Sequence, residues 1–159
     1  MSTPTDIERT SYGGPSGSIA LGAHRQVIQS VGATRTLVAA ESGSLCLFDA
    51  ATGNIYTLPT PVEGMQFEFL QTVAVTSNAS RVSTSAATVF MVGAVNSTRL
   101  AASMDVFQAD GAATVGISMA GSTTGGLIGS NFTLTALNST QWAISGAIVG
   151  SGTLATPFV

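Results

Sequence analysis

The sequence predicts an all-β fold: an antiparallel β-sandwich or barrel, jelly-roll-like, with an extended N-terminal arm. Short apolar runs recur at a spacing of about ten residues, with turns rich in Gly, Asn, Asp and Pro between them. Residues 65–75 alternate apolar and polar side chains with a period of two, which is typical of a half-buried strand. Helical periodicity is nearly absent. Together these observations favour a domain built from sheets.

Strands in the first half of the domain are expected over residues 36–40, 45–48 and 55–58. The polar cluster 49–54 forms a turn between the second and the third strand. Two prolines follow the third strand, and proline cannot donate a hydrogen bond to a neighbouring strand. The third strand is therefore expected to end there.

The segment 65–75 carries the clearest strand pattern in the chain. Its large apolar side chains fall in one phase and are expected to face the core, while Gln66 and Glu68 face the opposite way. The apolar set comprises Met65, Phe67, Phe69, Val73 and Val75.

The second half repeats this arrangement of short strands and turns. Strands are expected over residues 88–92, 104–108, 113–119, 132–137 and 142–146, with a loop over 121–126. Asp110-Gly111 predicts a hairpin between the second and third of these, because this pair favours tight hairpin turns. Residues 138–140 predict a closing hairpin between the last two strands. The only window with helical propensity, 94–104, contains Asn96-Ser97-Thr98, which favours a turn.

The chain is expected to divide into an N-terminal arm, residues 1–34, and one β-domain, residues 35–159. Residues 10–18 have the composition of a linker, and the arm holds too few apolar side chains to fold alone. We expect it to become ordered by lying across a neighbouring molecule. No signal peptide and no apolar run of about 20 residues is found, which predicts a protein made in the cytoplasm without a membrane span.

The composition favours an assembly subunit. Only 8% of the 159 residues are charged and none is lysine, yet the mean hydropathy is +0.42. An ordinary soluble domain has about 25% charged residues, so this surface is unusually neutral, and neutral surfaces favour association. The net charge of −3 argues against nucleic acid as a partner, because the arginines are few and scattered. They are Arg9, Arg25, Arg35, Arg81 and Arg99.

No catalytic, metal or cofactor site is predicted. A hydrolase needs a nucleophile, a base and a group that orients the base, and the sole imidazole, His24, lies in the arm. A catalytic carboxylate pair would be drawn from side chains that occur mostly at turns and lack an aromatic sugar cleft. These are Glu41, Asp49, Glu63, Glu68, Asp105 and Asp110.

Other reactive or ligand-binding patterns are also incomplete. The Gly-rich stretch 121–126 lacks the Lys-Ser/Thr of a phosphate-binding loop, and Asp105 and Asp110 lack the spacing of a calcium loop. Cys46 stands alone in an apolar run, where it is expected to fill the core. Trp142 is expected to pack in the core or at a subunit boundary, with its indole N–H hydrogen-bonded.

The stretch from Thr36 to Val75 resembles a module that is widespread in virion proteins of tailed bacteriophages. The pattern is roughly an apolar strand ending in a small turn, a Phe-Asp or Leu-Asp pair, a Gly turn, an aliphatic-Thr-Leu-Pro strand and a Gly-aliphatic-x-Phe-x-Phe strand. Here these parts are Leu37-Val38-Ala39-Ala40-Glu41-Ser42-Gly43, Phe48-Asp49, Thr52-Gly53, Ile55-Tyr56-Thr57-Leu58-Pro59 and Gly64-Met65-Gln66-Phe67-Glu68-Phe69. The closing Gln141-Trp142-Ala143-Ile144-Ser145-Gly146 resembles the usual end of the module, so the likeness covers about two thirds of the chain.

A single compact module without visible repeats looks like a capsid decoration, or cement, protein. The resemblance implies a homotrimer at three-fold or quasi-three-fold positions on the outer capsid surface, made in the cytoplasm of the bacterial host. Its partners would be the major capsid protein, whose neighbouring subunits it clamps, and itself.

Two other functions are compatible with parts of the sequence. The same module occurs in tail-fibre and vertex appendages that bind host receptors, although aromatic side chains are scarce here, at 6%. A small glycan hydrolase or lyase is the second of these, and the missing base argues against it. An unrelated β assembly protein is the remaining alternative.

Overall fold

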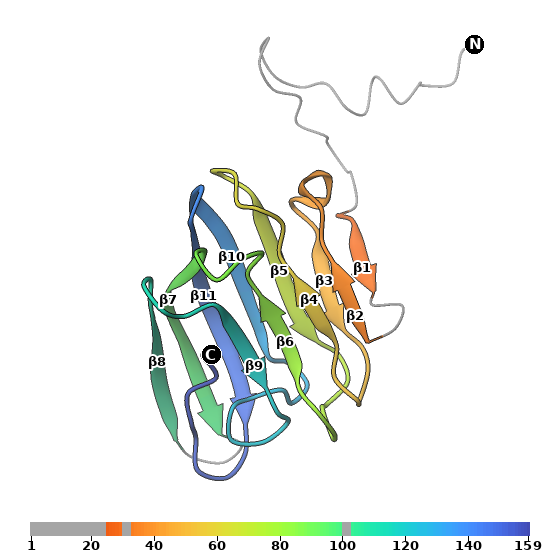
Figure 1. Ribbon diagram of the computed structural model, residues 1–159. Coiled ribbons are helices and arrows are strands. Elements are labelled where there is room, and N and C mark those ends of the chain that lie inside the picture. Colours follow the sequence, from red (N-terminus) through yellow and green to blue (C-terminus); the bar gives the residue numbers. More distant parts are fainter. Residues whose placement is uncertain (1–24, 30–32, 100–102) are drawn as a thin grey trace, which may run out of the picture.

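The computed structural model describes residues 25–29, 33–99 and 103–159 and has an all-β architecture, which confirms the predicted fold class. Two sheets pack face to face as a sandwich (Figure 1). The seven-stranded sheet has the order β1 (Val27–Gln29), β3 (Leu45–Phe48), β5 (Gln66–Gln71), β10 (Asn131–Asn138), β11 (Gln141–Gly150), β7 (Phe90–Arg99) and β8 (Met104–Asp110). The four-stranded sheet has the order β2 (Thr34–Thr36), β4 (Ile55–Thr57), β6 (Ser80–Ser83) and β9 (Gly116–Met119). A 3-10 turn, η1 (Ala39–Glu41), precedes β3.

Both sheets are mixed, so the expectation of antiparallel pairing is only partly correct. From β1 to β6 the chain alternates between the layers: β1, β3 and β5 pair in parallel in one sheet, and β2, β4 and β6 in the other. Parallel neighbours need a crossover, and here a strand of the opposite sheet supplies it in place of a helix. The strands β7 and β11 are also parallel, whereas β10 is antiparallel to both of its neighbours.

The core between the sheets is mainly apolar, with an aromatic cluster at its centre. Phe69 stacks on Phe132 with ring centroids 5.2 Å apart, and Tyr56 meets Phe69 edge to face at 5.6 Å. Trp142 is fully buried beside Phe67 at 6.0 Å. Each such ring removes about 150–250 Å² from water, so a few aromatic side chains hold the two layers together.

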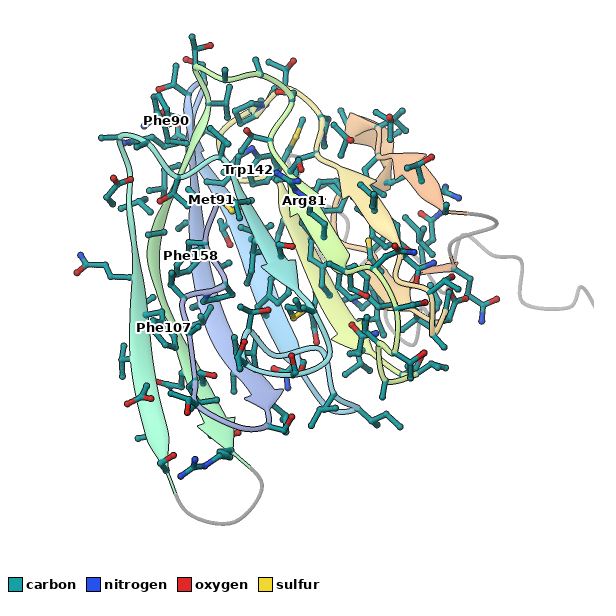
Figure 2. All side chains as sticks on the ribbon, turned by 60° about the horizontal axis from the view of Figure 1, so that its bottom comes forward. Arg81, Phe90, Met91, Phe107, Trp142 and Phe158 are labelled. Atoms are coloured by element: carbon teal, nitrogen blue, oxygen red, sulfur yellow. The ribbon has the colours of Figure 1, made fainter. Side chains whose placement is uncertain are left out.

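The C-terminal segment covers the core on the side where β7 and β8 lie. The C-terminal segment adds a single bridge between Phe158 and Ile117 of β9, and Phe107 and Phe158 both pack against the core (Figure 2). The four-stranded sheet is narrower than its partner, so this segment contributes cover that a further strand would otherwise supply.

The period-two expectation for residues 65–75 holds over the strand itself. Phe67 and Phe69 are buried and Gln66 is exposed, while Met65 is half-buried at the core margin. The expectation is wrong for Val73, which is 37% exposed, because β5 ends at Gln71 and the alternation ends with it. Val75 is buried, but it lies in the loop after β5 and not in the strand.

The hairpin expected at Asp110-Gly111 is wrong. Strand β8 pairs with β7 and strand β9 pairs with β6, so the segment between them crosses from one sheet to the other. The local turn chemistry is present, since Gly111 has a φ of 74°. A tight turn does not by itself determine which strands pair, because the pairing follows the face that each strand buries.

Other boundaries also differ from those expected. Asn96-Ser97-Thr98 lies within the ten-residue strand β7 and forms no turn, because β7 pairs on both sides, with β8 and β11. The strand expected over 36–40 is replaced by β2 and η1, and β6 was not expected. The closing hairpin of β10 and β11 is confirmed, with a bulge between Ala136 and Asn138.

The domain begins before residue 35, inside the range expected for the arm. Strand β1 adds in parallel to β3, and its Ile28 is 3% exposed. Strand β2 begins at Thr34. The rest of the expected arm, residues 1–24 and 30–32, lies outside the described residues.

Candidate functional site

Two of the six candidate carboxylates, Glu41 and Glu68, form ion pairs with arginines. Glu41 in η1 pairs with Arg35 at 2.5 Å and also accepts a hydrogen bond from the Val38 amide at 2.9 Å. Glu68 on β5 pairs with Arg25, whose Nε donates to the Gly43 carbonyl at 2.7 Å. Both carboxylates therefore join neighbouring segments of the part of the domain that holds β1 to β6, here called the winding half.

Asp110 has a third role, in the segment that crosses between the sheets. Its Oδ1 accepts hydrogen bonds from the amides of Ala113, Ala112 and Thr114 at 2.9, 3.0 and 3.1 Å, and from the Thr114 hydroxyl at 3.1 Å. These hydrogen bonds, first from Ala113 and Ala112, hold the pKa of Asp110 well below its usual range. The carboxylate orders the crossing and has no described partner of a catalytic kind.

This geometry predicts a pH dependence of stability. Because the pKa of Asp110 is lower in the folded than in the unfolded chain, its stabilisation is present above the unfolded pKa of about 4 and is lost as the pH falls further. Thermal unfolding of Asp110→Asn should give a lower Tm than wild type at neutral pH, and this gap should narrow below about pH 4. Asp105→Asn, on the same strand but outside the turn, controls for the loss of one charge. If the difference in Tm between wild type and Asp110→Asn stays constant from neutral pH to below about pH 4, the proposed role of Asp110 in the turn is contradicted.

Cys46 and Trp142 lie in the core, as expected. Cys46 is fully buried, and this burial raises the pKa of its thiol to about 12, with Glu41 adding to the effect. The thiol is therefore protonated at neutral pH and unreactive. The expected hydrogen bond of the Trp142 indole is wrong, because its Nε1 has no partner among the described residues.

The Gly-rich loop 121–126 uses its own amides internally. Gly121 donates to the Gly125 carbonyl at 2.7 Å, and Gly125 donates to Ser122 at 3.2 Å. The amide of Ala120, just before the loop, donates to the Thr124 hydroxyl at 2.9 Å. These donors face the loop itself, whereas a phosphate-binding loop directs its amides toward a ligand.

The remaining candidates carry no cluster. Glu63 and Asp105 are exposed and Asp49 is half-buried, and His24 lies outside the described residues. Within the described ranges no group of three or more His, Cys, Asp or Glu side chains is placed to hold a metal ion. In the same part of the chain, no helix is long and apolar enough to cross a membrane.

The most unusual surface is the outward face of the seven-stranded sheet, here called the outer sheet face. Alternate residues of its strands point away from the core, and none of their side chains is buried. One row across the sheet, following the pairing register, is Gln29, Leu47, Leu70, Asn131, Ala147, Asn96 and Val106. The next row is Val27, Leu45, Glu68, Thr133, Ser145, Ala94 and Gln108. Two shorter rows follow toward opposite ends of the strands: Gln66, Thr135, Ala143, Val92 and Asp110, and Val149, Thr98 and Met104.

The outer sheet face is nearly free of unpaired charge. Among its described residues the charged side chains are Glu68, which is paired with Arg25, and Asp110, which lies at the margin and is bound to its own turn. Its centre holds small residues such as Ala94 and Ser145, and its β8 margin exposes larger apolar ones. Covering a face of this composition with protein costs little free energy of desolvation, because burying an unpaired charge is the main cost of covering a surface.

Sequence reasoning did not find this face, although part of the signal was present. In β10 and β11 the positions that alternate with the core residues are Thr133, Thr135, Ala143, Ser145 and Ala147. Their small, uncharged character could be read from the sequence once the phase of each strand was known. The assembly of these positions into one surface depends on the strand order, which the sequence did not reveal.

No protein-family model matches the chain, and no curated protein is significantly similar to it.

Proposed function

We propose that this chain is a structural virion protein that binds the outer surface of a phage capsid as a homotrimer. It stabilises the shell by clamping neighbouring major capsid subunits. Its role is structural and not catalytic, and its partners are the major capsid protein and itself, without nucleic acid or membrane.

The outer sheet face is the observation that carries this proposal. It spans all seven strands of the larger sheet, and its one central carboxylate, Glu68, already has a partner in Arg25. Surfaces rich in Lys and Glu favour solubility, whereas a broad neutral face favours association. A protein with such a face is suited to permanent contact with other protein surfaces.

The residues that resemble the virion module support the same proposal, because they shape the winding half of the domain. Phe48, Phe67 and Phe69 are all fully buried between the layers. Gly53 makes its turn at a φ of 79°, where an added Cβ would lie 2.3 Å from the Ala79 carbonyl oxygen. The likeness therefore rests on residues that determine architecture, and its extension to a capsid role is by analogy.

The position of β1 is compatible with the proposed role of the arm. Strand β1 is an edge strand, so the chain enters the sandwich at the margin of the outer sheet face. We propose that the segment before it reaches a neighbouring shell or decoration subunit. Repetition of such contacts over a symmetric shell adds up by avidity.

The copy number of the chain in purified virions tests this proposal. A decoration protein occurs at about one copy per shell subunit, or at a simple fraction near two thirds, because it follows the symmetry of the lattice. A tail-fibre or vertex appendage, the competing function, is limited to a small number of sites on each particle.

A further inference from the structure

We propose that a water molecule is bound inside the sandwich, at the end where β4 and β6 begin, by the side chains of Asn54, Ser80 and Gln71. The water acts there as a structural ligand that joins the two sheets. This inference goes beyond the proposed function and does not depend on it. Its basis is a group of three buried polar side chains, here called the polar end layer.

Each side chain of the polar end layer is buried and has one polar atom without a hydrogen bond. Asn54 and Ser80 are 0% exposed and Gln71 is 1% exposed. Asn54 Nδ2, Ser80 Oγ and Gln71 Oε1 have no partner among the described residues. A buried polar group without a hydrogen bond costs free energy, so nearly all such groups in proteins bond to the chain or to ordered water. These three atoms therefore indicate a ligand.

The pairing of β4 with β6 places Asn54 beside Ser80. The two strands are parallel, with Ile55 opposite Arg81, and the Arg81 amide donates to the Asn54 carbonyl at 2.8 Å. One position earlier on each strand, Asn54 and Ser80 are neighbours. Tyr56 is buried two residues after Asn54, and residues two apart on a strand share a face. Both polar side chains therefore point into the core.

Gln71 faces them from the seven-stranded sheet. Phe69 of β5 meets Tyr56 of β4 edge to face, with ring centroids 5.6 Å apart. Strand β5 runs toward this end of the sandwich and β4 runs away from it, because β3 is parallel to β5 and the turn 49–54 leads from β3 into β4. The layer beyond the two rings therefore holds Gln71, two residues after Phe69, and Asn54, two residues before Tyr56.

The other atoms of the two amide groups are already bonded, which fixes how each amide is oriented. Asn54 Oδ1 accepts hydrogen bonds from the Asp49 and Ala50 amides at 3.0 and 3.1 Å, so its Nδ2 is the free donor. Gln71 Nε2 donates to the Val73 carbonyl at 2.6 Å, so its Oε1 is the free acceptor. The polar end layer thus offers one donor and one acceptor of fixed identity.

A water molecule matches this set of atoms. It can accept from Asn54 Nδ2, donate to Gln71 Oε1, and either donate to or accept from the Ser80 hydroxyl. Three hydrogen bonds are the usual number for a buried water. The water would connect β4 and β6 of one sheet to β5 of the other.

An ion is a less suitable occupant of the polar end layer. A hard cation is bound by several oxygen atoms, whereas Asn54 presents an N–H group. An anion would be buried without a charged partner in the layer, which costs several kcal/mol. A small neutral molecule that both donates and accepts avoids both costs, and water is that molecule.

High-resolution crystal structures and thermal unfolding of the full-length protein test the inference. Ser80→Ala removes one partner of the water and leaves the turn that Asn54 caps unchanged. The matched control is Ser97→Ala. Ser97 is also 0% exposed with an unpartnered Oγ, but the residues paired with it, Asp105 and Ile148, provide no buried unpartnered polar atom.

We expect wild type and Ser97→Ala to show one ordered oxygen at about 2.7–3.2 Å from Asn54 Nδ2 and Gln71 Oε1. Ser80→Ala should have a Tm about 2–4 °C below that of wild type, because one hydrogen bond of the water is lost. Ser97→Ala should show no decrease, because it removes an unpaired buried hydroxyl.

Three results would overturn the inference. One is a wild-type structure without an ordered oxygen in the polar end layer, and another is a direct hydrogen bond between Asn54 Nδ2 and Ser80 Oγ. The third is the same change in Tm for both serine variants. If Ser80→Ala does not fold, the wild-type electron density decides by itself.

Discussion

Replacing Trp142 with Ala should lower the free energy of unfolding by about 3–5 kcal/mol, because the largest side chain of the core leaves a cavity behind. Trp142 is 0% exposed and packs against Phe67 with ring centroids 6.0 Å apart. For a domain of this size each 1 kcal/mol corresponds to roughly 2–4 °C in Tm, so we expect a decrease on the order of 10 °C. Denaturant and thermal unfolding followed by circular dichroism give both quantities.

Trp142→Phe is the matched control for this prediction. The indole Nε1 has no described hydrogen-bond partner, so phenylalanine removes a buried unpaired donor and loses no hydrogen bond. Its cost should stay below about 1.5 kcal/mol, since only part of the ring volume is lost. Equal costs for Ala and Phe would show that the indole N–H is hydrogen-bonded in solution, contrary to the structure. A negligible cost for Ala would show that the side chain is not buried.

Replacing Gly121 with Ala should be the most damaging single-methyl change in the loops. Gly121 has a φ of 77°, and an added Cβ would lie 1.9 Å from the Val75 carbonyl oxygen. The backbone of the loop would have to move, which would disturb the hydrogen bond from the Val75 amide to Gly126 at 3.0 Å. We expect a loss of roughly 3 kcal/mol or more in unfolding free energy.

Gly129→Ala separates the clash from the backbone strain. Gly129 has a φ of 92°, but nothing lies within 4 Å of its added Cβ. This variant should therefore show only the cost of a left-handed conformation for alanine, about 1–2 kcal/mol. Equal losses in the two variants, measured by urea unfolding, would contradict the close approach of Gly121 to Val75.

The local strand patterns in this sequence were informative where a strand has one buried face. Phe67 and Phe69 on β5 were expected in the core and lie there, because alternation records burial directly. Trp142 on β11 was expected in the core or at a subunit boundary, and it lies in the core. The closing hairpin was also recognisable, since β10 and β11 are consecutive and joined by a short polar turn. These features depend on residues close together in sequence.

The pairing of distant strands was not recognisable. Asp110-Gly111 has the chemistry of a hairpin turn, yet its flanking strands belong to different sheets. The parallel windings of β1 to β6 use strands of three to six residues, too short to show which neighbour they join. The outer sheet face was missed for the same reason, because it joins residues from seven strands whose order is a tertiary property.

The structural roles of the candidate reactive residues were predicted more successfully than the pairing of the strands. Cys46 was expected to fill the core, and it does. The turn role expected for Asp110 is present, although it orders a crossing between sheets and not a hairpin. What the sequence could not indicate is that Glu41 and Glu68 each face an arginine, because both partners lie on neighbouring segments that meet only in the fold.

If the chain coats a capsid, its copy number in purified virions follows the number of shell subunits. Quantitative mass spectrometry with labelled peptides compares this chain with the major shell protein in the same particles. We expect about one copy per shell subunit, or a simple fraction near two thirds, as lattice symmetry requires. A ratio on the order of a few hundredths would contradict it, because a protein confined to the tail or to one vertex cannot follow the lattice.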